Sequence, residues 1–550
     1  MYLGQMEVQI QTRIRIQLGM SCDAAGGTGR NRPVDSLFGP RPNYAVLSSA
    51  LGLLLGAASS AVQAAATIQA ASPALIDVSR AIASAVDGDT VIVPPGKASW
   101  TSGLVITKGV TLMGQTTTDP INKTANDQTI ILDNVVRGAG GTPIISVQSV
   151  LGKSYRLSGI TFSPGSVTTS NYNGAIKLLG NSQTVRVDHC HFNNLAHQAV
   201  AIRVMDSVYG VIDHNVIDFN AGGGGGYSIV PSNGGDGNGD AAWAAPAAYG
   251  SSQFIFIEDN CFNNLNYANR EYAGSTDDDH GARWVYRYNH CYDVEVQTHG
   301  TECCRYRGGR AMEVYNNDFH FSVNRAGTIG IRSGGLITHD NTVYGARPNH
   351  GAIIQAYRMY FKFPGPFGGA SGDNPWDSND PHGLYESGTV TSGSGTTLVD
   401  TTKNWTTNQW AGYAVKRLSD GGFSLILSNT SNTLNVFYYS DSGGSPIWTA
   451  GNQYQIRRTL VALDQPGRGG GDLVTGDTPI NSRTGTPAWT QEALEPCYSW
   501  NNRYVPTNVL LDIYAPIGAP QLLLGRDFYN NTPMPGYTPY IYPHPLIRSP

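Results

Sequence analysis

The hydrophobic pattern of this sequence is a short motif that recurs along the chain. In each copy, alternating apolar and polar residues are followed by a polar pair, any residue, and an aromatic or aliphatic one. The clearest copies are RVDHCHF (186–192), VIDHNVI (211–217), FIEDNCF (256–262), YRYNHCY (286–292), EVYNNDF (313–319) and LITHDNTV (336–343). Aligned on one polar position per copy, the motifs are spaced by 25, 45, 30, 27 and 24 residues, at Cys190, Asn215, Asn260, His290, Asn317 and Asn341. Periods of about 20 to 50 residues are typical of solenoids.

The repeated unit reads as β-strands, not helices. The apolar positions alternate with period two, and Gly, Asn or Asp bounds each run. A strand with one apolar face cannot bury that face alone, but stacking each coil on the next makes a continuous apolar interior. A polar residue at the recurrent bend, usually Asn, can bond backbone groups that the turn leaves unpaired and can adopt the left-handed conformation. The pattern therefore predicts a β-solenoid with a column of bend residues.

Residues 73–115 resemble the opening of a known family. They contain an amphipathic stretch followed by GDTVIVPPG (88–96), and this segment looks like the start of right-handed parallel β-helix proteins of the pectin-lyase-like superfamily. The resemblance covers roughly residues 70–385 and 461–530. It implies an all-β fold, a right-handed parallel β-helix with an N-terminal capping helix, in which Val78, Ile82 and Ala85 face the open end of the core.

Residues 386–460 interrupt the repeat with short Thr, Val and aromatic strands between Gly, Ser and Asn turns, which predicts a small inserted all-β domain. Its three tryptophans either form a sugar-stacking face or, as we favour, build the core of so small a domain: Trp405, Trp410 and Trp448. The expected organisation is a leader (1–64), a first part of the β-helix (65–385), the inserted domain (386–460), and a return of the β-helix with a tail (461–550). The Pro/Tyr-rich end of the tail, 536–546, is expected to lie extended against the last coils.

The segment 42–66 predicts export. Its apolar run from Ala45 to Ala58 is followed by small residues ending at Ala64, which is the layout of a secretory signal cleaved after Ala64. The run is too short to span a membrane. We therefore expect a secreted protein, extracellular or periplasmic, with no membrane span.

The cysteine count and the net charge bear on disulfide formation and on the class of ligand. Loss of the leader leaves six of the seven cysteines, an even number that permits disulfides in an exported protein without fixing their pairing: Cys190, Cys261, Cys291, Cys303, Cys304 and Cys497. We expect one or both of the adjacent Cys303 and Cys304 to pair with cysteines on neighbouring segments, in preference to a redox role. No CxxC pair is present, which disfavours a structural zinc site. A formal charge of −5 argues against a nucleic-acid binder that relies on bulk positive charge.

Polar and charged residues are densest between residues 270 and 313. In a β-helix, the outer face of one sheet and its flanking loops can form a long groove, and a linear polysaccharide matches such a groove. The window supplies acids, histidines and arginines for a site there: Asp277, Asp278, Asp279, Glu302 and Glu313; His280, His290 and His299; Arg283, Arg287, Arg305, Arg307 and Arg310.

Cleavage of a uronate polymer by elimination needs a cation near the sugar carboxylate, a base for the C5 proton, and a donor near the leaving oxygen. The candidate catalytic residues are His299, Arg310, Arg283 and Glu302, with His299 as base or acid and an arginine as clamp or base. Three adjacent carboxylates could bind calcium: Asp277, Asp278 and Asp279. The candidate substrate-binding residues are Arg305, Arg307, Glu313, Tyr227 and Trp243, the last two within the Gly/Ala-rich segment 221–250 that could wall the groove.

Each candidate also has a structural reading. The DDD run could be a solvated turn, and His189 and His290 occupy bend positions. Arginines 305, 307 and 310 could pair with Glu302 and Glu313 on adjacent coils. The strand containing Asp188 and His189 is similar to a pectate-lyase strand of the type W-I-D-H, but the second acidic strand and the R-x-P-x-x-R segment of those enzymes are missing here.

Three functions remain open from the sequence. The first is a lyase acting on an anionic polysaccharide. The second is a non-catalytic adhesin or structural rod, and the third is a glycoside hydrolase using Asp278 with Glu302 or Glu313. An enzyme predicts a convergent, partly buried cluster, whereas a rod predicts acid–arginine pairs satisfied along the coils. Phage tailspikes share the fold, but the export signal argues against that assignment.

Overall fold

A computed structural model describes residues 64–137, 141–166, 173–195, 200–219, 226–235, 239–265, 273–300, 307–354, 384–411, 413–438, 447–457, 466–469, 493–515 and 522–548. The chain divides into two compact units, 1–65 and 66–550, and the second is described below. The predicted signal segment, Glu302, Cys303, Cys304 and Arg305 lie outside the described residues.

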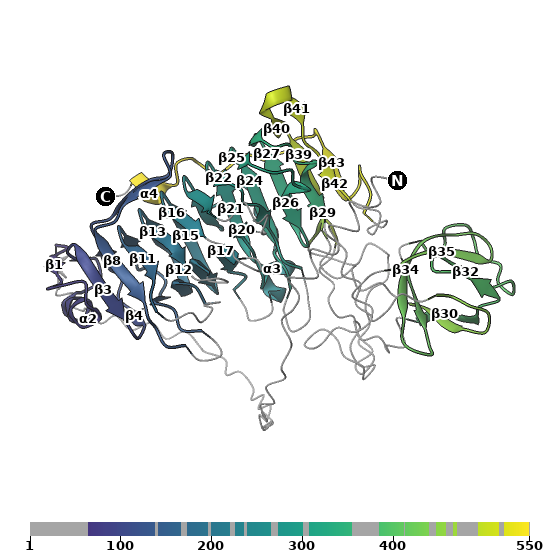
Figure 1. Cartoon of the computed structure of the whole chain (residues 1–550), viewed down its shortest axis with the longest axis horizontal. Helices are drawn as coiled ribbons and strands as arrows, with labels where there is room; N and C mark the ends of the chain where they lie inside the picture. The colour runs from purple at the N-terminus through teal and green to yellow at the C-terminus, as the bar shows by residue number, and fades with distance from the viewer. Residues whose placement is uncertain are drawn as a thin grey trace, which may run out of the picture. The chain divides into compact units, whose positions relative to one another are not determined.

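The second unit is a right-handed parallel β-helix, as predicted, and its coils contribute strands to three sheets (Figure 1). Sheet A contains β1 (Thr67–Gln69), β2 (Thr90–Ile92), β5 (Thr111–Met113), β10 (Tyr155–Ser158), β12 (Ile176–Asp188), β15 (Ser207–Asp213), β18 (Ile255–Glu258), β21 (Arg283–Arg287), β24 (Ala311–Tyr315), β27 (Gly335–His339), β39 (Cys497–Trp500) and β43 (Phe528–Asn530). Sheet B contains β3 (Gly96–Trp100), β8 (Thr129–Asp133), β11 (Thr161–Pro164), β13 (His191–Leu195), β16 (Val216–Phe219), β19 (Cys261–Asn264), β22 (His290–Tyr292), β25 (Asp318–Phe321), β28 (Thr342–Gly345), β40 (Arg503–Tyr504) and β41 (Val509–Leu510).

Sheet C consists of two runs of parallel strands. The first comprises β4 (Leu104–Ile106), β9 (Ile145–Ser149), the first part of β12, β14 (Ile202–Met205), β17 (Gly226–Ser232) and β20 (Ala273–Thr276). The second comprises β23 (Val296–Gln297), β26 (Gly327–Ile331), β29 (His350–Ile354) and β42 (Ile513–Tyr514). A bridge between Gly274 and Glu295 links the runs. A hairpin of β6 (Thr117–Asp119) and β7 (Thr124–Asn126) and a short pair, β37 (Arg468–Gly469) and β38 (Ala493–Leu494), complete the secondary structure of this part together with η5 (Val505–Thr507).

A column of buried asparagines fixes the turn from sheet A to sheet B. The side-chain oxygen of Asn215 accepts the backbone N–H of Cys190 at 2.9 Å, and that of Asn260 accepts the N–H of Asn215 at 3.0 Å. The same contact continues through Asn289, Asn317, Asn341 and Asn502. Because each oxygen bonds the backbone of the preceding coil, the column holds successive coils in one register.

The sequence alignment of this column was wrong at one position. Asn289 belongs to it, and His290 is instead the first residue of β22. The left-handed residue is also not the ladder asparagine but the one before it, with φ from 51° to 56° at His189, His214, Asp259, Tyr288, Asn316, Asp340 and Asn501. His189 is thus a bend residue, as its structural reading expected.

The interior is a continuous apolar core, closed at its start by α2 (Leu75–Ser84). Val78, Ile82 and Ala85 are buried in that core, which confirms the predicted capping helix. The ammonium of Lys108 donates to the carbonyls of Ile82 and Ala85 at the C-terminal end of α2, where a cation also complements the helix dipole. Each fully buried aliphatic or aromatic side chain contributes about 1.5–3 kcal/mol, so the stacked core supplies the main stabilising term.

The predicted inserted all-β domain is an antiparallel sheet. Its strands are β30 (Leu384–Thr389), β31 (Ser392–Gly393), β32 (Thr397–Val399), β33 (Ala414–Arg417), β34 (Phe423–Asn429), β35 (Thr433–Tyr438) and β36 (Gln453–Arg457). Trp405, Trp410 and Trp448 are buried in its core. They build the domain, as we favoured, and do not form an exposed sugar-stacking face.

The described cysteines form no disulfide. Cys190, Cys261, Cys291 and Cys497 are all buried free thiols. Burial raises the pKa of Cys190 and of Cys261 to about 12, so both are held as protonated thiols that react slowly. The expectation of disulfides is therefore wrong for these four residues. Among the helices in the described part of the chain, none is long and apolar enough to cross a membrane.

Candidate functional site

Three polar residues meet on the outer face of sheet C, each just beyond the end of a strand. Asp277 follows β20, His299 lies two residues beyond β23, and Arg332 follows β26. Gln297 of β23 pairs with Gly330 of β26, so His299 and Arg332 occupy equivalent positions in successive coils. Alternation along β26 directs Ile331 into the core and leaves the next side chain, that of Arg332, on the outer face.

The His299 ring lies between the carboxylate of Asp277 and the guanidinium of Arg332. Both carboxylate oxygens of Asp277 are within 2.8 and 2.9 Å of Nδ1 of His299. Because a carboxylate accepts, this contact assigns the proton to Nδ1 and leaves the lone pair on Nε2. Nη1 of Arg332 is 3.2 Å from Nε2, which suits donation to that lone pair. The side chains are deeply buried, with exposed fractions of 1% for Asp277, 4% for His299 and 8% for Arg332.

The same face carries further cations on earlier coils. Lys177 of β12 pairs in register with Arg203 of β14, and Arg203 bonds the carboxylate of Asp279 at 3.0 and 3.1 Å. Burial, together with the neighbouring charge of Arg203, lowers the pKa of Lys177. A face on which lysine and arginine lie this close favours an anionic ligand.

The three adjacent aspartates point to different partners. Asp277 bonds His299, Asp279 bonds Arg203 and Asp278 turns inward, accepting from Nε1 of Trp284 at 2.9 Å and from the backbone N–H of His299 at 2.6 Å. Burial raises the pKa of Asp278 well above its ordinary value. Within the described residues, no group of three or more His, Cys, Asp or Glu side chains is arranged to hold a metal ion. The three carboxylates thus have different partners in the protein, and calcium binding by them stays a prediction.

The side chains of Arg283 and Arg310 lie around α3 (Asp240–Ala244). Both donate to the carbonyl of Ala242, at 3.0 and 3.2 Å. Arg310 also bonds the carbonyl of Ala245 and the carboxylate of Glu495. Fully buried and engaged in this way, Arg310 fixes the C-terminal end of the short helix.

Of the predicted substrate-binding residues, two join this second cluster. Trp243 of α3 is buried between guanidinium groups, with Arg307 at 5.2 Å and Arg310 at 5.7 Å from its ring. Glu313 lies on sheet A, bonded to the Tyr537 hydroxyl and the Gly250 backbone. Tyr227 is on sheet C, where it pairs in register with Gly274.

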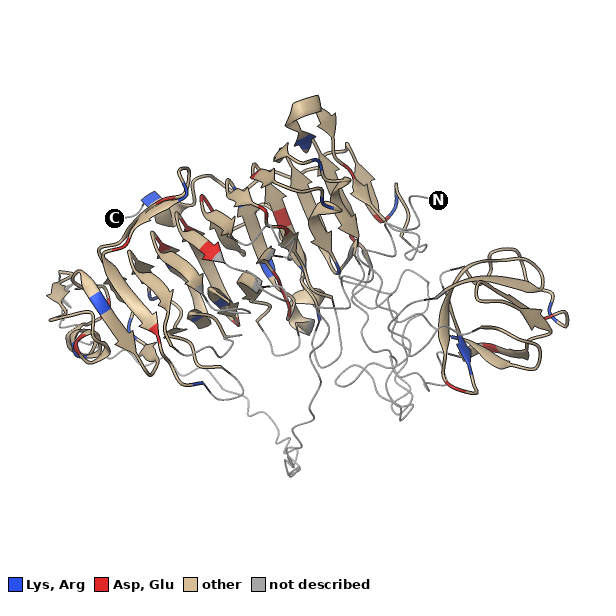
Figure 2. Cartoon of the chain, in the orientation of Figure 1, with Lys and Arg blue, Asp and Glu red and all other residues tan. Residues whose placement is uncertain are grey.

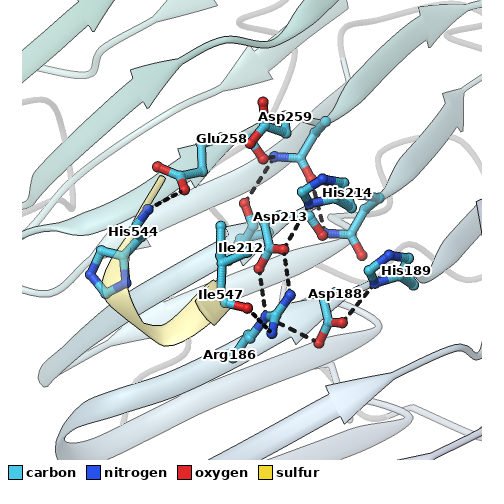
Figure 3. Close-up of polar contacts among 12 residues, drawn as sticks. Arg186, Asp188, His189, Ile212, Asp213, His214, Glu258, Asp259, His544 and Ile547 are labelled. Carbon is cyan, nitrogen blue, oxygen red and sulfur yellow. Dashed lines mark hydrogen bonds and ion pairs between the residues drawn. The ribbon is translucent and has the colours of Figure 1, made fainter. Parts of the chain in front are cut away.

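The outer face of sheet A is occupied by paired charges and by the C-terminal tail. Arg186 forms a bidentate pair with Asp213 at 2.9 and 3.0 Å and also donates to the carbonyls of Leu546 and Ile547 in the tail (Figure 3). Arg287 pairs with the fully buried Glu258, with Nε and Nη2 both contacting Oε2 of the carboxylate. Charged residues on the strands are otherwise sparse (Figure 2).

The tail reaches further back than the sequence suggested. Tyr537 bonds Glu313 of β24, His544 bonds Glu258 of β18 through its backbone N–H, and α4 (Pro545–Arg548) contacts β15. The segment therefore runs across the middle coils instead of lying only against the last ones.

Sequence reasoning missed Arg332 and the partnership of Asp277 with His299. A usable signal was present, since each residue comes directly or shortly after a strand in three successive coils: STDDD (275–279), VQTH (296–299) and GIRS (330–333). Polar residues at matched strand ends line up on one face of a parallel sheet.

No protein-family model matches the chain, and no curated protein matches it. Among solved structures, a mutant tailspike protein of E. coli bacteriophage HK620 in complex with a hexasaccharide matches with 10% identity and a TM-score of 0.20, over 67% of this chain and 86% of that chain. A double mutant of the same protein, in complex with a pentasaccharide, matches with 11% identity, the same coverage and a TM-score of 0.20. A TM-score this low carries no information about the function of this chain.

Proposed function

We propose that the protein is an exported lyase that cleaves a uronate-containing polysaccharide by β-elimination on the outer face of sheet C. The observation that carries the proposal is the buried cluster of Asp277, His299 and Arg332. It unites an oriented imidazole, its carboxylate partner and a guanidinium, which are the groups that elimination next to a sugar carboxylate requires.

In this mechanism Arg332 receives the carboxylate of the uronate. The bound carboxylate draws the guanidinium away from Nε2 of His299, and the guanidinium neutralises the carboxylate charge that keeps the pKa of the C5 proton high. The freed lone pair of Nε2 takes that proton, and Asp277 stabilises the imidazolium that results. The C5–H electron pair forms the C4=C5 double bond while the C4–O bond breaks, and the imidazolium or water protonates the leaving oxygen.

Hydrolysis by paired carboxylates has less support. Asp278 is enclosed by Trp284 and the backbone of His299, and a Cβ placed on Gly309 would lie 2.0 Å from its carboxylate oxygen. Glu313 is on sheet A, held by Tyr537. A glycosidase needs two carboxylates that face one sugar, but Asp278 and Glu313 are each held by other partners, and Glu302 lies outside the described residues.

Arg203 on sheet C also pairs with an acid, Asp279, but the non-catalytic reading is supported most by sheet A. Its arginines and acids pair along the coils, as expected for a structural rod. Sheet C differs because Arg332 contacts an imidazole, and an imidazole that already has a carboxylate on its other nitrogen gains little structural benefit from a cation.

A screen of uronate polymers tests the proposal. The purified protein is incubated with polygalacturonate, alginate and hyaluronan, with and without chelator, while ultraviolet absorbance follows unsaturated product and a reducing-end assay follows all cleavage. Elimination produces both signals together. Reducing ends without ultraviolet absorbance would indicate hydrolysis, and the absence of both would favour binding without catalysis. The chelator arm tests the calcium expectation separately.

A further inference from the structure

An aligned column of aromatic rings stands on the outer face of sheet B. Tyr292 of β22 pairs in register with His320 of β25, which pairs with Tyr344 of β28. The rings stack with centroids 4.7 Å apart at each step and interplanar angles of 16° and 10°. All three side chains are half-buried, so their rings support one another while their polar ends reach the surface.

The polar ends of this column have no partner in the described part of the chain. Among the described residues, none bonds the hydroxyls of Tyr292 and Tyr344 or the ring nitrogens of His320. The same row one coil earlier is different, because Asn263 bonds Asp218 at 2.9 Å and Asp218 also contacts His191 at 3.2 Å. In this row, the polar side chains before Tyr292 therefore bond one another, whereas those from Tyr292 onward face outward.

A hairpin marks this change. The β6–β7 hairpin crosses the earlier coils, where Asp127 bonds His191 at 2.7 Å and the Thr118 hydroxyl bonds the carbonyl of His214 at 2.5 Å. At its turn, the ammonium of Lys123 lies 3.9 Å from the centre of the Tyr292 ring. Lys123 is exposed, so a positive charge stands at the end of the outward-facing row.

We propose that Lys123, Tyr292, His320 and Tyr344 form a second, non-catalytic binding site for an acidic saccharide chain. Strands repeat every 4.8 Å or so, close to the length that one sugar residue adds to an extended chain. Each coil thus offers one hydrogen-bonding group to the hydroxyls of one sugar, and Lys123 pairs with a uronate carboxylate. The nearby carboxylate of Asp318 is already engaged by Thr342 and His290. The choice of a uronate rests on the proposed function, and the site belongs to a different sheet from His299.

Affinity electrophoresis tests this site in gels that contain polygalacturonate, alginate or hyaluronan. The measurement uses the His299→Gln protein, so that the polymer is not consumed during the run. We expect retardation by at least one polymer, and Tyr344→Ala and Lys123→Ala each weaken the apparent affinity about 5-fold, the range of one or two lost hydrogen bonds. Tyr344→Phe, which keeps the ring stack, reproduces most of the loss. The matched control is Tyr498→Ala, which removes another half-buried tyrosine stacked on a neighbour, Tyr529 at 5.2 Å, on sheet A.

The outcomes separate this site from the proposed reaction. Unchanged affinity in Tyr344→Ala and Lys123→Ala, equal loss in Tyr498→Ala, or no retardation by any of the polymers overturns the second site. Retardation that depends on Lys123 and Tyr344, together with a wild-type protein that yields no unsaturated product from any of the polymers, would support this site and overturn the lyase. If the wild-type protein cleaves a polymer but Lys123→Ala and Tyr344→Ala leave the affinity unchanged, the lyase is supported and the second site is overturned.

Discussion

Sheets A and C present similar charged residues but use them differently. On sheet A, Arg186 and Arg287 face Asp213 and Glu258 across neighbouring coils, and the tail adds carbonyl acceptors. On sheet C, Arg332 faces an imidazole whose other nitrogen is held by a carboxylate.

The difference shows how one solenoid places its stabilising ion pairs on one sheet and its candidate reactive groups on another. In a buried acid–arginine pair, the charges of the two partners neutralise each other. An imidazole between an acid and a cation keeps a lone pair and a proton that can exchange roles. The comparison therefore predicts that changes on sheet A mainly reduce stability, and that changes on sheet C mainly reduce activity.

The largest expected effect is on sheet A. Arg287→Met leaves Glu258 buried without its partner and removes the donors to the Tyr540 and Ile541 carbonyls of the tail. Breaking a buried pair from one side costs about 3–5 kcal/mol, measured as a lower free energy of unfolding in denaturant. The control is Arg80→Met, whose pair with Asp77 is surface-exposed and should change stability little. Equal stability of the two variants would contradict the role assigned to sheet A.

On sheet C, Asp277→Asn should lower turnover at least 100-fold, because an amide does not stabilise the imidazolium or fix its tautomer. Its thermal midpoint should stay within a few degrees of wild type. Asp512→Asn is the matched control, since Asp512 bonds Nδ1 of His350 at 2.8 Å on the same sheet. Similar losses of activity in both variants would mean that such pairs only support the fold.

A third prediction concerns Arg310, which the sequence suggested as a catalytic group. Because Arg310 is fully buried and bonds Glu495, the α3 carbonyl of Ala242 and the carbonyl of Ala245 just after the helix, Arg310→Ala should lower the free energy of unfolding by about 3 kcal/mol. Thermal denaturation checks this. If the variant kept wild-type stability but lost turnover, Arg310 would instead act in the reaction.

Acid should weaken sheet A through Asp188. Burial alone would raise its pKa, but hydrogen bonds from Arg156 and His189 and the charge of Arg186 outweigh burial and lower the pKa of Asp188. A lowered folded-state pKa contributes stability that is complete above the unfolded value of about 3.9 and is lost as the pH falls below it. Denaturation curves at a series of pH values should therefore show a shallower acid limb in Asp188→Asn. An unchanged limb would contradict the assignment.

The smallest effect is expected at the tail. Tyr542→Phe removes one hydroxyl, which donates to Asp259 at 2.9 Å, while its ring still stacks on Tyr288 at 3.7 Å. The free energy of unfolding should fall by about 0.5 kcal/mol, since the bond is partly solvent-exposed. A loss several times larger would mean that the tail detaches as a unit.

The fold could be predicted because its determinants are local and repeated. Period-two alternation, a polar bend and the capping stretch with Val78 and Ile82 are all readable within one coil. The error at His290 arose because the bend has two special positions, a left-handed residue and then the ladder asparagine, and Tyr288-Asn289-His290 offers two polar residues for one place.

The site was only partly predictable, because it depends on register between coils. Asp277 and His299 stood out in a dense polar window, but Arg332 lies outside that window and meets His299 only through the pairing of β23 with β26. The sequence alone could not show that Arg283 and Arg310 belong to a different cluster from Arg332. Their role depends on α3, whose position over them is a tertiary feature.

One comparison of two histidines tests the central claim most directly. His299→Gln and His350→Gln both remove a carboxylate-paired imidazole from sheet C, and among the described residues only His299 also contacts an arginine, Arg332. With the polymer that gives most unsaturated product, we predict that His299→Gln loses at least 100-fold in initial rate while His350→Gln stays within about twofold of wild type. Equal rates in the two variants, whether both retained or both lost, would contradict the assignment of the reaction to this cluster.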